Sequence, residues 1–317
     1  MATVVQTDYA WPDVSIERIV IERAGHRLVV GPAVPASAAE IEALVAQHDP
    51  QAIMACWAQV SGAAIAAPAN LKIVQRIGVG LDNIDVAAAT ARGAFVANVP
   101  DYCVDEVSAH AVGFVLDWAR GITAFDRDVK RGAWNPAAAV LRRVADLTVG
   151  IVGYGRIGTM TGTRLRAFGC RVLTNSLGGS GTDHRELPDL LSESDVVIVH
   201  APLLPDTHHL IDADAIARMR DGAFLVNVSR GPLIDTQALI AALETGKLSG
   251  AGLDVVEGEP EPPRALVERP DVIVTPHIAF SSGASLDELR RRSAEEVVRA
   301  LAGEPLHFPC NQPKALS

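Results

Sequence analysis

Arg230, Glu259 and His277 are the residues of this chain best suited to chemistry, and they occur in that order, 29 and then 18 positions apart. Their segments, each broken by glycine or proline, read NVSRGPLID, GLDVVEGEP and VTPHIAF. An imidazole can protonate an oxygen that gains negative charge, and a guanidinium can bind a carboxylate with two hydrogen bonds. A carboxylate beside the imidazole would orient the ring and favour its protonated form. Downstream of a nucleotide-binding motif, these groups predict hydride reduction of a 2-keto acid.

Each of the three residues also has a plainer interpretation. Arg230 could cap a turn or form a salt bridge. Glu259 lies in an acidic loop with Glu257 and Glu261 and could be a solvated charge. His277, after Pro276 at the end of an apolar stretch, could be a structural histidine. The joint pattern favours the catalytic interpretation.

The segment GIVGYGRIG, residues 150–158, matches the G-x-G-x-x-G pattern of dinucleotide-binding folds. An apolar strand is expected directly before it and a helix over 156–168 directly after it. Gly153 would allow the tight turn, Gly155 would let a pyrophosphate approach the backbone, and Gly158 would let helix and strand pack closely. The helix amino terminus, with Arg156 and Ile157, would offer N–H groups to the phosphates. The plainer alternative is an ordinary strand-to-helix turn.

The position that usually selects the cofactor departs from the common pattern. An acidic residue that binds the ribose hydroxyls of NAD is expected about 20 residues after the glycines, and that place falls on Ser176. Serine does not repel a 2′-phosphate, so NADP is permitted. The nearest arginines, Arg171 and Arg185, do not follow it directly, and Asp183 is expected to be a solvated loop residue. The cofactor is therefore predicted to be NADP or NAD.

Short apolar runs alternate with helical stretches along the chain, which predicts an α/β protein with parallel sheets. The expected strands near the amino terminus are residues 3–8, 52–56, 72–76 and 94–99, with helices over 38–47 and 84–91. A long apolar-periodic helix is expected over 103–120, and 125–145 is expected to be irregular. Six more strands follow, in LTVGIVG, CRVLTN, VVIVH, FLVNV, GAGLDVV and VIVTPH. The helices expected between them are 156–168, 188–193, 212–219 and 235–245.

We expect two doubly wound parallel-sheet domains with an interdomain cleft. Residues 1–99 with 284–317 would form a flavodoxin-like substrate domain, completed by a final helix over 284–302. Residues 100–283 would form an NAD(P)-binding Rossmann domain. The chain would then cross between domains near 99–102 and 279–284, and two crossings make a hinge that can close on substrate.

Composition limits the other possibilities. The 317 residues are enough for two cores, and 49% hydrophobic with only 4% aromatic residues predicts cores of Ala, Val, Leu and Ile. A net charge of −10 argues against nucleic-acid binding. The four scattered cysteines form no C-x-x-C pair, so neither a metal site nor a disulfide framework is indicated. Without a basic start, an apolar leader or a long apolar run, a cytoplasmic protein that does not bind membranes is expected.

With these motifs in place, the chain resembles the D-isomer-specific 2-hydroxyacid dehydrogenase family. The resemblance rests on GYGRIG, NVSRGPLID, GLDVVEGEP and TPHIA, and extends to RIGVGLDNID (76–85) and NVPDYCVDEVSAHAVGFVL (98–116). It implies a D-2-hydroxy acid as the reduced substrate and a homodimer joined through the coenzyme domains. It implies that Arg230 binds substrate and that Glu259 pairs with the acid/base His277. The residues that it implies at the cofactor are His200, Ala201, Pro202, Thr207, Val228, Asp254 and His277, with Asp254 at the nicotinamide carboxamide.

Within the family, two details resemble the C-terminal-binding-protein-like branch. Arg76 stands where that branch has a second substrate-facing arginine, and Phe280 where it has an aromatic residue. Val79 and Gly80 match the loop that grips the substrate carboxylate. An aromatic wall would favour an extended apolar side chain, although Phe280 could simply pack. The alternatives to an oxidoreductase are a corepressor-like dimer that senses NAD(H), and oxidation of a phosphite-type anion held by Arg76 and Arg230.

Overall fold

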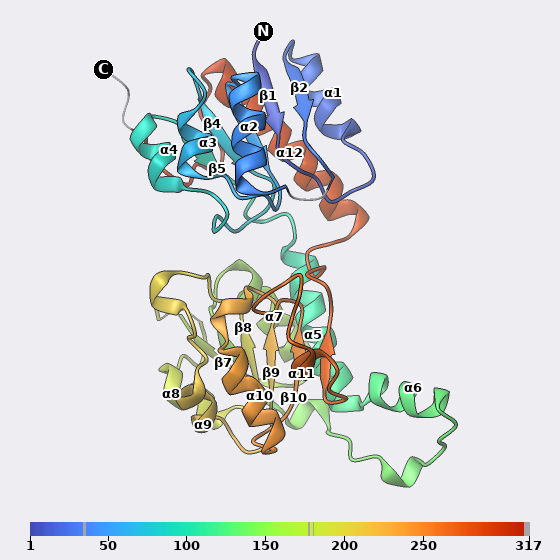
Figure 1. Cartoon of the computed structure of the whole chain (residues 1–317). Helices are drawn as coiled ribbons and strands as arrows, with labels where there is room; N and C mark the ends of the chain where they lie inside the picture. The colour runs from blue at the N-terminus through green and yellow to red at the C-terminus, as the bar shows by residue number, and fades with distance from the viewer. Residues whose placement is uncertain (34–35, 177, 180, 314–317) are drawn as a thin grey trace. The chain divides into compact units, whose positions relative to one another are not determined.

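The computed structural model describes residues 1–33, 36–176, 178–179 and 181–313. The chain forms two compact units, Met1–Tyr102 with Ser282–Ser317, and Cys103–Ser281. Each unit has its own parallel sheet covered by helices (Figure 1). The prediction of two parallel-sheet α/β domains is therefore confirmed.

The first unit contains a five-stranded sheet in the order β2-β1-β3-β4-β5, and every neighbouring pair is parallel. This is the flavodoxin-like strand order. The strands are β1 (Thr3–Gln6), β2 (Arg27–Val30), β3 (Ala52–Ala55), β4 (Ile73–Arg76) and β5 (Phe95–Ala97). The helices are α1 (Ser15–Arg23), α2 (Ala38–His48), α3 (Gly62–Ala66), α4 (Val86–Arg92) and α12 (Gly283–Ala302).

Three elements of this unit were not predicted. Strand β2, RLVV, is short and only half buried, and it follows the turn at Gly25-His26. Helix α1, SIERIVIER, mixes charged and apolar residues so closely that neither a helical nor a strand period stands out. Helix α3 has only five residues, too few for a periodic signal.

Helix α12 is the segment that brings the end of the chain back into the first unit, where it packs beside α1 and against β3 and β4 (Figure 1). Its contact with α1 contains a buried ion pair. Arg290 donates to both carboxylate oxygens of Glu17, at 2.9 and 2.8 Å, and to the main-chain oxygen of Asp13. The side chains of Arg290 and Glu17 are 8% and 0% exposed. Because both side chains are shielded from water, each charge is compensated by the other.

The second unit contains a six-stranded parallel sheet in the order β11-β10-β9-β8-β6-β7. Its strands are β6 (Thr148–Val152), β7 (Arg171–Asn175), β8 (Val196–Val199), β9 (Ala223–Asn227), β10 (Leu248–Leu253) and β11 (Val272–Val274). Beyond β7, Thr174 forms a parallel bridge with His184. The third strand of a Rossmann sheet is thereby reduced to one bridge at the outer edge of β7.

The helices of the second unit are α5 (Val104–Arg120), α6 (Ile122–Lys130), α7 (Arg156–Ala167), α8 (Leu187–Glu193), α9 (Ala213–Arg218), α10 (Thr236–Glu244) and α11 (Arg264–Val267). Short 3-10 turns occur at Pro136–Ala138, Val144–Asp146, Pro205–Thr207 and Gly231–Leu233. The expectation that 125–145 is irregular was wrong at its start. Helix α6 forms there, and the helical spacing of Ile122, Phe125 and Val129 is a signal that was overlooked, although none of its residues is buried.

The core consists mainly of aliphatic residues. Strand β8 is buried along its whole length, as expected for a central parallel strand. Cys56, Cys103 and Cys170 are buried free thiols, and burial raises the pKa of Cys56 to about 12. Among the described residues, no helix combines the length and apolar character needed to cross a bilayer.

The buried ion pair gives a test of how α12 is held. Replacing Glu17 by Ala leaves the Arg290 guanidinium buried beside Asp13, and should lower the free energy of unfolding by about 3–5 kcal/mol in urea titrations. Arg291→Ala is the matched control on the same helix, because Arg291 pairs with Glu295 in solvent. We expect that control to cost less than about 1 kcal/mol. Equal effects of the two substitutions would show that the Glu17 contact does not anchor α12.

Candidate active site

The three predicted catalytic residues follow three adjacent strands of the second unit. Strands β9, β10 and β11 are neighbours in the sheet, and Arg230, Glu259 and His277 lie in the segments after them. In a parallel sheet all carboxyl ends meet at one edge, where open α/β sheets bind ligands. The topology therefore brings the loops that carry the three residues to the same edge.

His277 and Glu259 are in direct contact. The distance from His277 Nδ1 to Glu259 Oε1 is 2.9 Å, and both side chains are partly exposed. The carboxylate fixes the ring through Nδ1. The interpretation of Glu259 as a merely solvated charge does not fit this contact.

His277 adopts a left-handed backbone conformation, with φ 53°. A positive φ is costly for a residue with a side chain and persists only where neighbours enforce it. Here the enforcing contacts come from Asp254. Its main-chain oxygen accepts the N–H of His277 at 2.8 Å, and its buried carboxylate accepts the N–H groups of Ile278 at 2.9 Å and Ala279 at 2.8 Å.

Two further residues support this clamp and were missed in the sequence. Thr275 donates its hydroxyl to Asp254 Oδ1 at 2.6 Å, and His110 Nε2 lies 3.0 Å from the same hydroxyl. Thr275 directly follows strand β11, and a polar residue at that position is the one available signal. His110, on α5, gives no such signal because it lies 165 positions away from Thr275. The role predicted for Asp254 at the nicotinamide stays a prediction, and its observed contacts position the loop of His277.

Arg230 is held by its own loop. Its Nη1 donates to the main-chain oxygen of Ser229 at 2.8 Å, and Asn227 Nδ2 donates to the main-chain oxygen of Arg230 at 2.8 Å. Ser229 in turn donates its hydroxyl to Val199 at the end of β8. The NVSRG segment thus uses the side chains on either side of Val228 to fix the arginine at the edge of the sheet. Val228 itself is buried.

The glycine motif has the geometry of a phosphate cradle. Gly153 has φ 96°, and a Cβ there would lie 2.5 Å from the backbone of His200 and Ala201. A Cβ on Gly158 would lie 2.2 Å from the main-chain oxygen of Gly153, whereas one on Gly155 would meet nothing within 4 Å. The first and third glycines are thus required by close packing, and the second leaves open space above the amino terminus of α7. These residues fit a dinucleotide pyrophosphate.

The segment after β8, predicted to lie beneath the adenosine, is tightly built. His200 Nε2 lies 3.0 Å from Thr161 Oγ1 on α7, and burial lowers the pKa of His200 to about 3, so the ring is neutral at pH 7. Thr207 donates its hydroxyl to the main-chain oxygen of Pro202 at 2.7 Å and closes the turn. Contact of Ala201 and these residues with a cofactor stays a prediction.

Asp183 is an exposed turn residue, as predicted, but its charge is not isolated. It forms ion pairs with Arg171 at 3.4 Å and Arg185 at 2.8 Å. The ion pairs were not predicted, because only the bridge beyond β7 brings residues 183–185 alongside the strand that begins at Arg171. Ser176 follows β7 directly and lies at the carboxyl end expected for the ribose.

Arg76, Val79 and Gly80 lie in the first unit, after β4. The buried guanidinium of Arg76 donates to main-chain oxygens of its own surroundings, those of Ala55, Ile77 and Gly80. Asn98 Nδ2 donates to the main-chain oxygen of Val79 at 2.7 Å. These contacts indicate that Arg76 braces the loop. Direct contact of the arginine with substrate stays a prediction.

Phe280 lies next to the proposed acid/base. Its ring centroid is 6.2 Å from that of His277, and the two rings meet edge to face. The aromatic side chain can therefore limit the space on one side of the imidazole.

Two other features lie apart from this arrangement. A cavity of about 520 Å³ that includes Trp118, Arg142 and Arg220 adjoins the amino ends of β6 and β9, opposite the edge with His277. In the described ranges, His208, His209 and Glu257 could together hold a metal ion. His209 Nε2 already lies 2.8 Å from Glu257 Oε1, so a simple hydrogen bond accounts for that pair.

Comparisons with known proteins agree with this geometry. The family model for the NAD binding domain of D-isomer specific 2-hydroxyacid dehydrogenases matches residues 112–279. A D-3-phosphoglycerate dehydrogenase from Mycobacterium bovis is 39% identical over 252 residues, which cover 77% of this chain and 48% of that protein. The match thus spans about half the length of that relative. A hydroxypyruvate reductase from Thermotoga maritima is 38% identical over 253 residues, which cover 78% of this chain and 81% of that protein.

A solved structure extends the similarity to the whole chain. The NADPH-dependent glyoxylate/hydroxypyruvate reductase of Sinorhizobium meliloti, in complex with NADP and malonate, superposes with a TM-score of 0.85 at 28% identity. The match covers 99% of each chain.

The buried neutral His200 predicts a pH-dependent stability. Its folded pKa lies below the unfolded value near 6.5, so the unfolded chain binds the extra proton as the pH falls from 6.5 toward 3, and the folded state loses stability over that window. His200→Gln cannot titrate. Its free energy of unfolding in urea should depend less on pH there, by up to about 1.4 kcal/mol per pH unit. Parallel curves for the two proteins would contradict a neutral buried imidazole.

Proposed function

Because the chain belongs to the D-isomer specific 2-hydroxyacid dehydrogenase family, we propose that it transfers a hydride between a nicotinamide dinucleotide and a 2-keto acid / D-2-hydroxy acid pair. The observation that carries the proposal is the contact between His277 and Glu259 at the carboxyl edge of a dinucleotide-type sheet. Hydroxypyruvate and glyoxylate, the substrates in the names of similar proteins, are the first to test.

In this mechanism a bound dinucleotide supplies the hydride. Protonated His277 donates from Nε2 to the keto oxygen as negative charge develops there, while its Nδ1–H donates to Glu259. Glu259 lowers the cost of the imidazolium because an opposite charge stands beside it. Arg230 binds the substrate carboxylate and polarises the keto group. Asp254 holds the loop so that the ring of His277 stays in place.

The dinucleotide would lie along the glycine motif, with its pyrophosphate at the amino terminus of α7 and its adenosine toward Ser176. Open space at Gly155 and the enforced turn at Gly153 support this placement. Because Ser176 carries no charge, this position alone allows either NAD or NADP.

Membership of the C-terminal-binding-protein-like branch is a narrower proposal. Phe280 supports it, because its ring stands edge to face with His277 and would contact a substrate side chain. Arg76 supports it less, because its guanidinium is engaged by three main-chain oxygens. Phenylpyruvate is the substrate that tests an aromatic wall.

We expect His277→Ala to lower kcat for reduction of hydroxypyruvate, glyoxylate or phenylpyruvate by about 10²–10⁴-fold, with dinucleotide binding retained. Glu259→Gln keeps an oxygen beside the ring but removes the charge, so its loss of kcat should be smaller. Steady-state rates with NADH and NADPH measure both effects. His48→Ala, in the other unit on α2, is the control and should keep full activity.

Two results would contradict the proposal. One is the absence of turnover by the unaltered protein on every 2-keto acid tested with either cofactor. The other is near-full activity of His277→Ala, which would remove the imidazole from the reaction.

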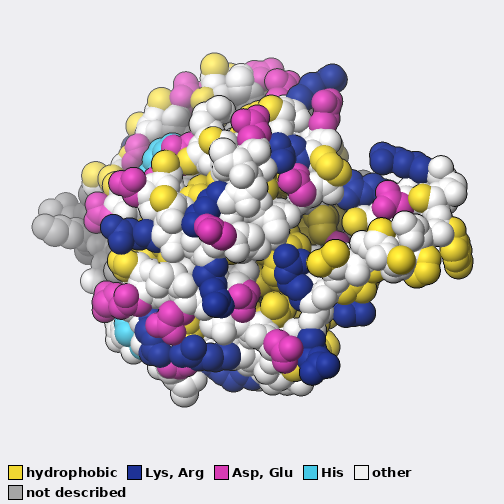
Figure 2. All heavy atoms as spheres, turned by 90° about the horizontal axis from the view of Figure 1, so that it is seen from below, with side chains coloured by type: hydrophobic (Ala, Val, Ile, Leu, Met, Phe, Trp, Pro, Cys, Tyr) yellow, Lys and Arg dark blue, Asp and Glu magenta, His cyan; other side chains and the backbone are white. Residues whose placement is uncertain are grey.

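We further propose a homodimer joined through the second unit. Helix α6 and the turns after it extend from the rest of their unit (Figure 1) and carry a group of hydrophobic side chains seen from below in Figure 2. Trp134 is 83% and Val140 86% exposed, and Ile122, Val129 and Leu141 are also exposed. An apolar surface of this kind on a projecting segment is typical of an interface. A second copy of the chain is the partner that the family resemblance implies.

Trp134→Lys combined with Val140→Lys should convert the dimer to a monomer, because two charges would enter the apolar contact. Size-exclusion chromatography with light scattering measures the mass. Ile19→Lys, at a partly exposed apolar position of the other unit, is the control and should leave the mass unchanged. A monomeric unaltered protein, or an unchanged dimer in the double variant, would overturn this assignment of the interface.

A further inference from the structure

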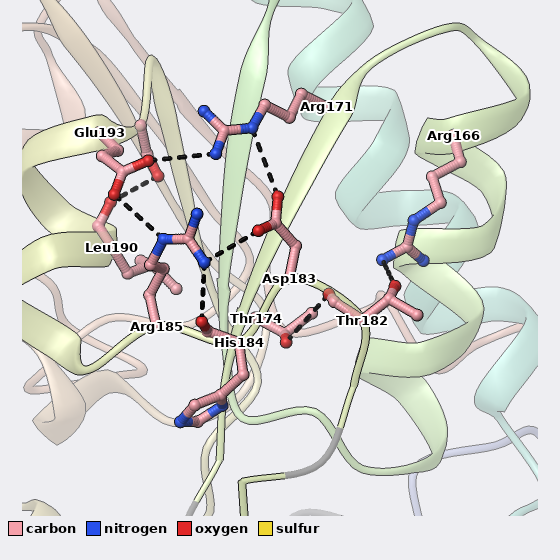
Figure 3. Close-up of polar contacts among 10 residues, drawn as sticks. Arg166, Arg171, Thr174, Thr182, Asp183, His184, Arg185, Leu190 and Glu193 are labelled. Atoms are coloured by element: carbon pink, nitrogen blue, oxygen red, sulfur yellow. Dashed lines mark hydrogen bonds and ion pairs between the residues drawn. The ribbon is translucent and has the colours of Figure 1, made fainter.

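The segment beside β7 carries a closed network of two arginines and two carboxylates (Figure 3). Arg185 lies 2.8 Å from Asp183 and 3.1 Å from Glu193. Arg171 lies 3.4 Å from Asp183 and 3.2 Å from Glu193. Each arginine therefore pairs with both carboxylates, and the four charges cancel.

The backbone of Arg185 lies at the carboxyl end of β7. Its N–H donates to the main-chain oxygen of Thr174 at 2.9 Å, and its main-chain oxygen accepts from Asn175 Nδ2 at 3.0 Å. Asn175 is the last residue of β7, and Ser176 comes next. Among the described residues of this outer strand and its bridge, Arg185 is thus the cation whose backbone lies closest to the predicted ribose position.

The guanidinium of Arg185 nevertheless points away from the carboxyl edge, toward the amino edge of the sheet. It shares its two carboxylates with Arg171, the first residue of β7, and Glu193 is the last residue of α8, near the amino edge of the sheet. Four residue steps of a strand separate Arg171 from Asn175, roughly 13 Å. The two carboxylates therefore hold the charge of Arg185 back from the carboxyl edge.

The residues around this network hold it against the glycine motif. Arg166 on α7 donates to Tyr154 Oη at 3.0 Å and to Thr182 Oγ1 at 2.9 Å (Figure 3 shows the contact with Thr182). Tyr154 lies between Gly153 and Gly155, so the segment that leads into Asp183 is tied to the loop predicted to bind the pyrophosphate. The network is therefore linked through Arg166 to the loop predicted to bind the coenzyme.

We propose that Asp183 and Glu193 make this protein selective for NAD by withholding the guanidinium of Arg185 from a 2′-phosphate. The inference rests on the proposed function and names the cofactor of that same site. A 2′-phosphate carries about −1.5 to −2 charges at pH 7. It would have to draw Arg185 away from two carboxylates and then lie near them. The uncharged 2′-hydroxyl of NAD neither requires Arg185 to leave its carboxylates nor is repelled by them.

The expected size of the effect is modest, because the four side chains are 30–50% exposed. Partly exposed ion pairs contribute little individually, and two must be broken to release Arg185. We expect the network to reduce NADP affinity relative to NAD by about tenfold, which corresponds to about 1.4 kcal/mol.

The test is isothermal titration of the full-length protein with NAD⁺ and with NADP⁺. The double variant Asp183→Asn, Glu193→Gln keeps the shape of both side chains and removes their charges. Asn tolerates the positive φ of 62° at position 183. The unaltered protein should prefer NAD⁺, and the double variant should shift the affinity ratio about tenfold toward NADP⁺ with NAD⁺ affinity retained.

Two further variants distinguish the roles of the two arginines. Adding Arg185→Gln to the double variant should abolish the gain in NADP⁺ affinity, whereas adding Arg171→Gln should preserve it, because Arg171 starts the strand at the far end. Asp189→Asn, on the same helix as Glu193 but outside the network, should leave the ratio unchanged.

Three results would overturn the inference alone: NADP⁺ preference in the unaltered protein, an unchanged ratio in the double variant that still binds NAD⁺, or an equal loss on removing either arginine. Failure of the unaltered protein to bind either dinucleotide would overturn the proposed function together with the inference.

Discussion

The buried carboxylate of Asp254 is the constraint on which the site depends. Asp254 directly follows strand β10, and its carboxylate and main-chain oxygens together accept three successive amide N–H groups, those of residues 277 to 279. A carboxylate that accepts several backbone N–H groups in a buried position makes strong, directional hydrogen bonds. These bonds stabilise the left-handed backbone of His277, which would otherwise be unfavourable. Because the backbone of His277 is already fixed, its imidazole loses little conformational entropy when it contacts Glu259.

The rest of the second unit positions the other parts of the site by bringing the carboxyl ends of its strands to one edge. Strands β9, β10 and β11 are adjacent, so loops that are far apart in the sequence share one edge. The glycine motif stands on β6, two strands from β9, and its tight turn packs against the backbone of His200. Cofactor cradle, arginine loop and histidine loop are therefore positioned by the same parallel hydrogen-bond pattern. Strand order brings these loops to one edge, and side-chain contacts such as those of the Asp254 carboxylate then fix the residues within them.

The sequence predicted the fold class and the strands of the second unit because buried parallel strands are continuous apolar runs with clear ends. It also predicted the pairing of Glu259 with His277, since each residue type suggested a partner for the other. It could not predict the left-handed conformation of His277 or the clamp by Asp254, because main-chain donors carry no signature in side-chain identity. Helix α6 was missed although Ile122, Phe125 and Val129 recur at helical spacing; that apolar stripe stays outside the core. The ion pairs of Asp183 were missed because its partners become neighbours only through a single bridge beyond β7.

The loss of a full third strand at this sheet edge has its own consequence. Around His184 few ladder hydrogen bonds remain, so partly exposed ion pairs hold this segment beside β7. The loop of His277 is secured instead by buried bonds to Asp254. Dissolved ions weaken partly exposed ion pairs more than buried hydrogen bonds. Raising the ionic strength should thus loosen the segment proposed to distinguish cofactors, while the loop that carries the proposed acid/base stays fixed.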